Sequence, residues 1–167
     1  MTLALRPLAR ADLPLVDRWF RAPHAAPWFG SRDVAYLEDV LAGAEPIHAF
    51  IVTWDGEPIG FVEWSRFGDF PEMARNYEVT DPDAANCDIL LGEERFTGRG
   101  LGPALVEMLL FQQIFADPRV TTCVIDPHEA NVRAIRAYEK AGFRFVRRVI
   151  DDEDGVPLHL MERHRSP

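Results

Sequence analysis

The sequence has few cysteines, and their placement excludes two classes of protein. Only Cys87 and Cys123 occur among 167 residues. Each lies in an apolar stretch without a partner at the spacing of metal ligands, so we expect buried free thiols and no metal site. Neither cysteine has a nearby base in the sequence, which disfavours an acyl-enzyme intermediate.

Long hydrophobic runs are also missing. No segment approaches the roughly 18 uninterrupted apolar residues that a membrane-spanning helix needs. Residues 1–7 do not have the layout of a signal peptide. We therefore expect a cytoplasmic protein that does not bind membranes.

Positive charge is in short supply. Acidic residues outnumber basic residues by 27 to 18, which gives a formal net charge of -9. This balance disfavours nucleic acid as a partner and fits a small polycationic substrate. Solubility alone would also account for it.

What is present is typical of a soluble enzyme domain. Apolar residues make up 47% and charged residues 27% of the chain, and its length predicts one domain over residues 1–167. The apolar periodicity changes repeatedly between 2 and 3.6 residues, which predicts mixed α and β structure. The pattern predicts strands at 3–8, 47–54, 58–67, 87–92, 120–125, 143–150 and 156–161, and helices at 13–20, 34–41, 103–115 and 131–141.

Several residues predict where helices begin and end. Asp12, Ser31 and Asn131 are the expected N-caps, and Gly43 and Gly142 are expected to end the second and fourth helices. Residues 68–86 are polar and contain two prolines, so they are predicted as a long loop and a candidate substrate lid.

Three glycines stand at alternate positions between a predicted strand and a predicted helix. At such a turn, the N–H groups of Gly98, Gly100 and Gly102 would converge on an anion at the positive end of the helix, and Arg99 would add a charge. The spacing differs from the dinucleotide-binding fingerprint, and no Walker lysine follows. Taken alone, the pattern also fits a plain tight turn.

A second motif gives the glycine turn a context. About thirty residues further on, Asn131, Ala134, Tyr138, Gly142 and Phe143 follow the pattern Asn-x-x-Ala-x-x-x-Tyr-x-x-x-Gly-Phe. Both motifs, in this order, resemble those of the GCN5-related N-acetyltransferase (GNAT) superfamily. The resemblance implies an α/β fold with a mostly antiparallel sheet of six or seven strands, about four helices and a central V-shaped splay.

The resemblance also implies that acetyl-coenzyme A is the cofactor and that it lies in this splay. The family usually has Gln or Arg where Thr97 stands, which leaves the side-chain contacts open. The residues implied in cofactor binding are Ile89, Leu90, Leu91, Thr97, Gly98, Arg99, Gly100, Gly102, Pro103, Asn131 and Tyr138.

Within the superfamily the chain is most similar to the aminoglycoside 6'-N-acetyltransferases. Shared segments include residues 28–30, 56–60, 80–82 and 126–127. This implies direct attack of a primary amine, the 6'-amine of an aminoglycoside, on acetyl-coenzyme A by a monomer or homodimer. The alternatives are acylation of hydroxylysine in siderophore synthesis or of another metabolic amine, and a catalytically silent acyl-coenzyme-A sensor.

The resemblance implies roles for two carboxylates. An amine with a pKa of about 9 is only about 1% neutral at pH 7, so a base near it accelerates attack. Asp88 is implied as that base, and Asp126 as a substrate anchor or second base. Asp126 could instead only cap the turn before Pro127, whereas Asp88 on an apolar strand would need a partner.

Three aromatic residues complete the predicted site. Tyr138 is implied as the hydrogen-bond donor to the departing sulfur of coenzyme A, and it could also be a core aromatic residue. Trp28 and Phe29 are expected to line a substrate pocket or to seal the core, and the resemblance implies that Trp28 packs against the sugar rings of the substrate. Asn131 could serve as a helix cap and as a pantetheine contact.

Overall fold

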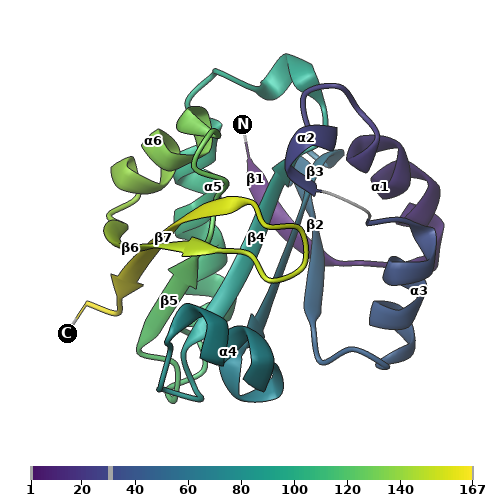
Figure 1. Cartoon of the computed structure of the whole chain (residues 1–167). Helices are drawn as coiled ribbons and strands as arrows, with labels where there is room; N and C mark the ends of the chain where they lie inside the picture. The colour runs from purple at the N-terminus through teal and green to yellow at the C-terminus, as the bar shows by residue number, and fades with distance from the viewer. Residues whose placement is uncertain (1, 30–31, 167) are drawn as a thin grey trace. The chain divides into compact units, whose positions relative to one another are not determined.

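The computed structural model describes residues 2–29 and 32–166 (Figure 1). Within them are seven strands and six α-helices, with short 3-10 and π segments between them. The strands are β1 (Leu3–Pro7), β2 (His48–Trp54), β3 (Glu57–Arg66), β4 (Ala85–Leu91), β5 (Thr122–Ile125), β6 (Arg144–Ile150) and β7 (Pro157–His164). The helices are α1 (Leu13–Phe20), α2 (Ala26–Phe29), α3 (Val34–Ala42), α4 (Pro71–Tyr77), α5 (Leu101–Leu109) and α6 (Val132–Lys140).

The strands are hydrogen-bonded in the order β1-β2-β3-β4-β5-β7-β6. The pairs β1–β2, β2–β3, β5–β7 and β6–β7 are antiparallel, and β4–β5 is parallel. The predicted mixed fold with a mostly antiparallel sheet is confirmed, with seven strands. The prediction of about four helices is wrong, because α2 and α4 were not expected.

The chain packs as two units. The first unit is Met1–Trp64 with Asp88–Leu101, and the second is Ser65–Cys87 with Gly102–Pro167. Strands β3 and β4 pass from one unit to the other. Each unit has its own cluster of buried apolar side chains. That residues 1–167 act as one domain stays a prediction.

The core of the first unit forms where α1 packs on the sheet. Leu13, Val16 and Phe20 recur at three- and four-residue intervals, so they share one buried helix face. Trp19 is also buried and lies over Gly92, where a Cβ atom would sit only 2.1 Å from its ring. Gly92 is therefore required for this packing.

Two predicted caps in the first unit need correction. Asp12 does not cap α1, because its carboxylate accepts hydrogen bonds from both Nη atoms of Arg6 at 2.7 Å and from the N–H of Ala9. Ser31 lies outside the described residues, and the side chain of Asp33 caps α3 through the N–H of Tyr36. Gly43 ends α3 in the left-handed conformation, with φ 72°, as predicted.

The second unit contains the main error in the predicted elements. Residues 68–86 were predicted as a loop, but α4 occupies Pro71–Tyr77. Pro71 suits the first turn of a helix because its missing N–H is not needed there. Tyr77 is buried, and Met73 and Ala74 pack against the same cluster. The spacing of Met73, Ala74 and Tyr77 fits one helix face, but the polar composition of residues 68–86 and their two prolines led to the prediction of a loop.

The other elements of the second unit follow the predictions more closely. The helix expected at 103–115 begins at Leu101 as α5 and continues as a wider π turn over Leu110–Ile114. The strand expected at 120–125 is shorter, because β5 begins at Thr122. Asn131 caps α6 by accepting a hydrogen bond from the N–H of Ala134 at 3.2 Å, as predicted.

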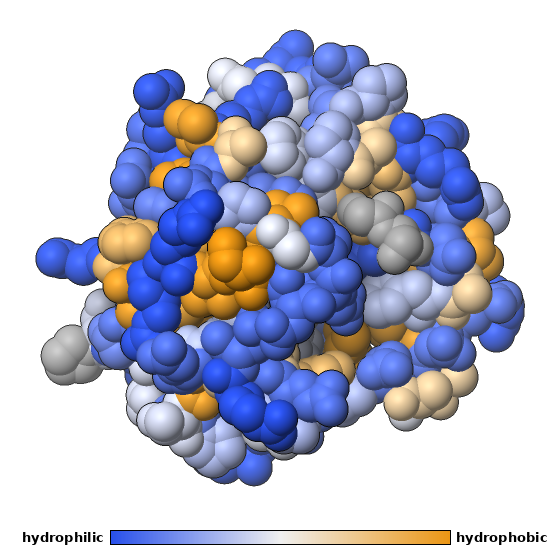
Figure 2. Space-filling model, in the orientation of Figure 1, coloured by the Kyte–Doolittle hydropathy of each residue, from blue (hydrophilic) through white to orange (hydrophobic). Residues whose placement is uncertain are grey.

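The face of the molecule in Figure 2 is largely hydrophilic, with a hydrophobic area over the β6–β7 hairpin. Phe145 and Ile150 of β6 are about half exposed, at 55% and 46%.

Within residues 2–29 and 32–166, no helix is both long and apolar enough to cross a membrane. Cys87 and Cys123 are buried in the second unit, with their sulfur atoms 3.7 Å apart.

Candidate active site

The glycine turn before α5 contains two residues with left-handed backbone. Gly98 and Gly100 have φ values of 73° and 77°, in the left-handed region that favours glycine. A Cβ atom added to either residue would meet no atom within 4 Å. The two glycines thus shape the turn and leave open space beside it, at the start of α5 where N–H groups are not used by the helix. The turn is open to a pyrophosphate group, and its contact with the cofactor stays a prediction.

Gly102 has a different role in the structure. A Cβ atom there would lie 3.4 Å from Cβ of Ala137, so Gly102 allows α5 and α6 to pack closely. Pro103 follows it in the first turn of α5 and has no N–H to offer. The cofactor contacts predicted for Gly102 and Pro103 stay predictions.

The side chains beside the turn are partly engaged. The hydroxyl of Thr97 donates to the carbonyl oxygen of Glu94 at 2.7 Å. Arg95 forms an exposed ion pair with Glu57, so it is not held toward the turn. Arg99 is exposed, with its guanidinium carbon 5.9 Å from the centre of the Phe96 ring. Arg99 is therefore the cation at this turn with the freest approach to a phosphate.

Strand β4 carries the predicted pantetheine contacts. Its pairing with β5 is limited to Ala85 with Cys123 and Asn86 with Val124. The carbonyl oxygen of Leu91 already lies 2.9 Å from Nε2 of His24. The role of Ile89, Leu90 and Leu91 in binding pantetheine stays a prediction.

Asp88, a carboxylate on an apolar strand, forms an ion pair with Arg32. Arg32 places Nη2 2.6 Å from a carboxylate oxygen of Asp88 and Nη1 3.2 Å from a carboxylate oxygen of Glu63. The hydroxyl of Tyr36 donates to the other oxygen of Glu63 at 2.8 Å. We call Arg32, Tyr36, Glu63 and Asp88 the Arg32 cluster. It joins α3, β3 and β4 with the segment before α3.

Burial governs the charges in the Arg32 cluster. The side chain of Glu63 is only 5% exposed, and burial together with the nearby Asp88 raises its pKa to about 7, although Arg32 opposes the shift. Burial would lower the pKa of Arg32, but Asp88 and Glu63 outweigh it and raise that pKa. Burial and Glu63 also raise the pKa of Tyr36. Arg32 and Tyr36 therefore keep their protons at neutral pH.

Asp88 was predicted from the sequence, whereas Arg32, Tyr36 and Glu63 were not. The signal it did have was an acidic residue on an apolar strand, which demands a buried partner. The spacing along the chain does not indicate Arg32 as this partner, because Arg32 is 56 residues away from Asp88.

The predicted aromatic residues lie on α2. Phe29 stacks on Phe20 with ring centres 5.7 Å apart, and Arg32 lies 5.4 Å from the centre of the Phe29 ring. Phe29 thus packs at the edge of the first core and contacts the Arg32 cluster. Trp28 is half-buried in the same turn. Their contact with a substrate stays a prediction.

In the second unit, Asp126 follows β5 and is held by two side chains. Its carboxylate accepts hydrogen bonds from the hydroxyl of Tyr77 at 2.5 Å and from Nδ2 of Asn86 at 3.3 Å. Tyr138 of α6 is buried, with its ring centre 6.0 Å from that of Phe143. A core position for Tyr138 is thus established, and its role toward sulfur stays a prediction.

Asp88 belongs to the first unit and Asp126 and Tyr138 to the second, so their joint action in catalysis stays a prediction.

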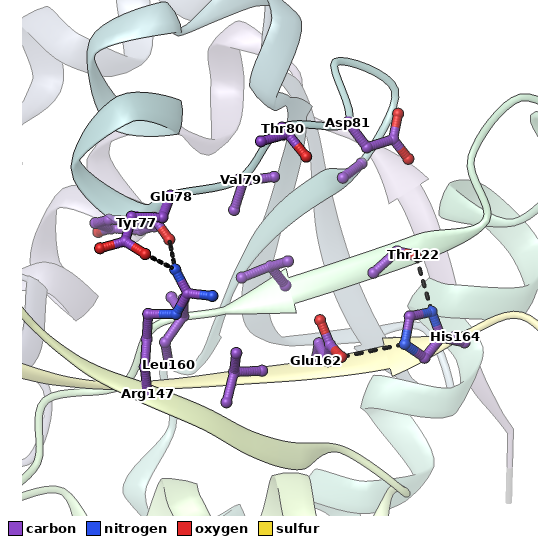
Figure 3. A pocket seen from close by; sticks show the side chains of 13 residues that line it. Tyr77, Glu78, Val79, Thr80, Asp81, Thr122, Arg147, Leu160, Glu162 and His164 are labelled. Atoms are coloured by element: carbon purple, nitrogen blue, oxygen red, sulfur yellow. Dashed lines mark hydrogen bonds and ion pairs between the residues drawn. The ribbon is translucent and has the colours of Figure 1, made fainter.

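The second unit also has a pocket of about 200 Å³ that none of the predicted site residues lines (Figure 3). Glu78 and Arg147 form an ion pair there, and His164 lies between Thr122 and Glu162. Tyr77 lines it and also holds Asp126. In the described part of the chain, no three His, Cys, Asp or Glu side chains are grouped to hold a metal ion.

Comparison with known proteins defines the family. The protein belongs to the GNAT acetyltransferases, because the model of the acetyltransferase (GNAT) domain matches residues 9–150. An aminoglycoside N(6')-acetyltransferase type 1 of Klebsiella pneumoniae is 31% identical over 99% of this chain and 85% of its own length. The crystal structure of aminoglycoside acetyltransferase AAC(6')-Ib with coenzyme A and kanamycin superposes with a TM-score of 0.81, at 31% identity over 98% of this chain and 95% of that one.

A more distant relative has another acceptor in its name. The lysine N-acyltransferase of Mycolicibacterium paratuberculosis is 25% identical over 86% of this chain and 66% of its own length. The superfamily and the fold predicted from the sequence are confirmed by these comparisons, and acetyl-coenzyme A is the cofactor of this family.

The open turn leads to a prediction with a matched control. Gly100→Ala and Gly43→Ala both place a side chain at a left-handed glycine with open space around it, with φ 77° and 72°. Each should lower the free energy of unfolding by about 1 kcal/mol. Only Gly100→Ala should also raise the Kd for coenzyme A, on the order of 10-fold, because its Cβ enters the space left for phosphate. Calorimetric titration with coenzyme A checks this, and equal affinity in both variants would remove the turn from the site.

Proposed function

We propose that the protein transfers the acetyl group of acetyl-coenzyme A to a primary amine of an aminoglycoside, the 6'-amine. The single observation that carries the cofactor half of the proposal is the open, left-handed turn at Gly98 and Gly100 before α5. The acceptor half is supported by the named function of relatives that align over nearly the whole chain. The net charge of -9 suits a polycationic acceptor.

Asp88 is the proposed base. An aminoglycoside amine reaches the site mainly as an ammonium group, which a carboxylate attracts. Asp88 takes up one proton of the ammonium group, directly or through water, because the nitrogen needs a free electron pair before it can attack a thioester. Arg32 holds this carboxylate in place and also contacts Glu63. A base of this kind contributes typically 10²–10⁴-fold.

Other residues bind and orient the two reactants. Asp126, fixed by Tyr77 and Asn86, is the proposed second carboxylate for the cationic acceptor. Trp28 is the proposed apolar surface for a sugar ring. Tyr138 donates a hydrogen bond to the sulfur of coenzyme A. When bound, acetyl-coenzyme A supplies an activated acyl group and a thiolate leaving group.

The acceptor is tested with three proteins and one panel. Wild type, Asp88→Asn and Asp39→Asn are incubated with acetyl-coenzyme A and with kanamycin, spermidine or hydroxylysine, and products are identified by mass spectrometry. Wild type should add one acetyl group to kanamycin at the 6' position. Asp88→Asn should be slower on the order of 10²-fold at pH 7, because it keeps the shape but loses the base. Asp39, exposed on α3, undergoes the same chemical change without contact with the Arg32 cluster, so Asp39→Asn should match wild type.

Two outcomes would count against the proposal. Acetylation of hydroxylysine or spermidine with none of kanamycin would exclude the aminoglycoside acceptor while keeping the acyltransferase. Equal rates for Asp88→Asn and wild type would exclude Asp88 as the base.

The role of Tyr138 is tested by Tyr138→Phe. A donor to a developing thiolate acts mainly in the transition state, so kcat should fall on the order of 10-fold while the Kd for coenzyme A changes little. The buried ring keeps its packing against Phe143 in this variant, so stability should change by less than about 1 kcal/mol. Unchanged turnover would leave Tyr138 with its structural role only.

A further inference from the structure

The Arg32 cluster has one more carboxylate than the proposed reaction uses. Glu63 and Asp88 lie on neighbouring strands, β3 and β4, and a single guanidinium group contacts both, at 3.2 Å and 2.6 Å. Glu63 is buried, whereas the side chain of Asp88 is 32% exposed and can meet a substrate. The inner carboxylate and the outer one therefore compete for the same positive charge.

We propose that Glu63 is a positioning residue that acts through Arg32 to set how strongly Asp88 attracts the proton of the acceptor amine. This inference rests on the proposed function, in which Asp88 is the base. Glu63 itself touches neither reactant in this scheme. Glu63 acts by changing the number of negative charges that Arg32 balances, which is two when Glu63 is ionised and one when it is protonated.

The two protonation states of Glu63 have opposite consequences for Asp88. When Glu63 is ionised, Arg32 balances two carboxylates, and the cluster carries a net charge of -1 that favours proton uptake by Asp88. When Glu63 is protonated, the whole charge of Arg32 faces Asp88 and holds it ionised. Acetyl transfer should thus be faster on the alkaline side of the Glu63 titration.

The surroundings of Glu63 leave few other groups to produce this effect. From α3 it receives the hydroxyl of Tyr36, and from the segment before α3 it receives Arg32. From β4 it faces Asp88. Opposite it on β2 stands Ala49, which has no charge. Because burial and Asp88 raise its pKa to about 7, Glu63 changes charge near neutral pH.

The first test compares pH profiles of kcat/KM for acetyl transfer. Glu63→Gln keeps the shape and an acceptor for Tyr36 but stays neutral at every pH, as protonated Glu63 does. The ratio of wild type to Glu63→Gln should be near 1 at pH 6 and rise through a midpoint near pH 7 to on the order of 10-fold at pH 8.5. A merely structural role for Glu63 would give a ratio that does not depend on pH, and that result would overturn the inference.

Glu57→Gln is the matched control. Glu57 lies at the start of the same strand, and its partner is the exposed Arg95. The same chemical change there should leave the profile of wild type unaltered. A pH-dependent ratio for Glu57→Gln of the same size would also overturn the inference, because the effect would then not be specific to the Arg32 cluster.

The second test needs no substrate and separates this inference from the proposed function. Carboxyl ¹³C NMR follows the titration of Glu63 in wild type and in Asp88→Asn. Removal of the Asp88 charge should lower the pKa of Glu63, because a negative neighbour is lost and Arg32 is freed for it. A pKa of Glu63 that is the same in both proteins would overturn the inference, even if acetylation occurs. A lowered pKa with no acetylation of any amine would keep the coupling and reject the proposed function.

Discussion

One guanidinium group balancing two carboxylates is the interaction on which the first unit depends. Arg32 draws together β3, β4 and the segment before α3 by contacting Glu63 and Asp88. Buried ion pairs of this kind give little net stability, because the groups lose their hydration. The ion pair instead fixes the position of the Asp88 carboxylate on β4.

The backbone around this cluster is constrained by glycines at close contacts. A Cβ atom on Gly60 of β3 would lie 2.4 Å from the carbonyl oxygen of Leu90, so glycine allows β3 and β4 to approach closely beside the cluster. Gly92 makes room for Trp19 directly after β4. Gly98 and Gly100 then turn the chain into α5. Within 15 residues the sequence thus places the Asp88 carboxylate, the contact of Gly92 with Trp19 and the open glycine turn along one strand and the turn that follows it.

Local chemistry allowed most elements to be predicted. The Asn131 cap, the glycine ends of α3 and α6 and the two hairpins depend on neighbouring residues, and all were found. Helix α4 was missed because its support comes from tertiary packing of Tyr77, Met73 and Ala74. Asp12 was misassigned as a cap because the competing partner, Arg6, lies in another element.

In the candidate site, too, the residues of local motifs were predicted from the sequence and their distant partners were not. Its motif residues were identified by resemblance, and the glycine turn has the backbone that this assignment requires. The partners of the motif residues were not found, because Arg32 with Asp88, Tyr36 with Glu63 and Tyr77 with Asp126 are 56, 27 and 49 residues apart. Periodicity and spacing carry no information about pairs at such distances.

The most direct test of the shared charge is the free energy of unfolding of Arg32→Met at two pH values. Burial and Asp88 raise the pKa of Glu63 to about 7 in the presence of Arg32, so in wild type Glu63 is mainly protonated at pH 5 and mainly ionised at pH 8. Loss of Arg32 therefore removes the attraction between Arg32 and an ionised Glu63 at pH 8 but hardly at pH 5. Arg32→Met should therefore cost about 3 kcal/mol at pH 8 and clearly less at pH 5, and Arg32→Met/Glu63→Gln should recover much of the loss at pH 8. An equal loss at both pH values, with no recovery in the double variant, would contradict a charge shared between Glu63 and Asp88.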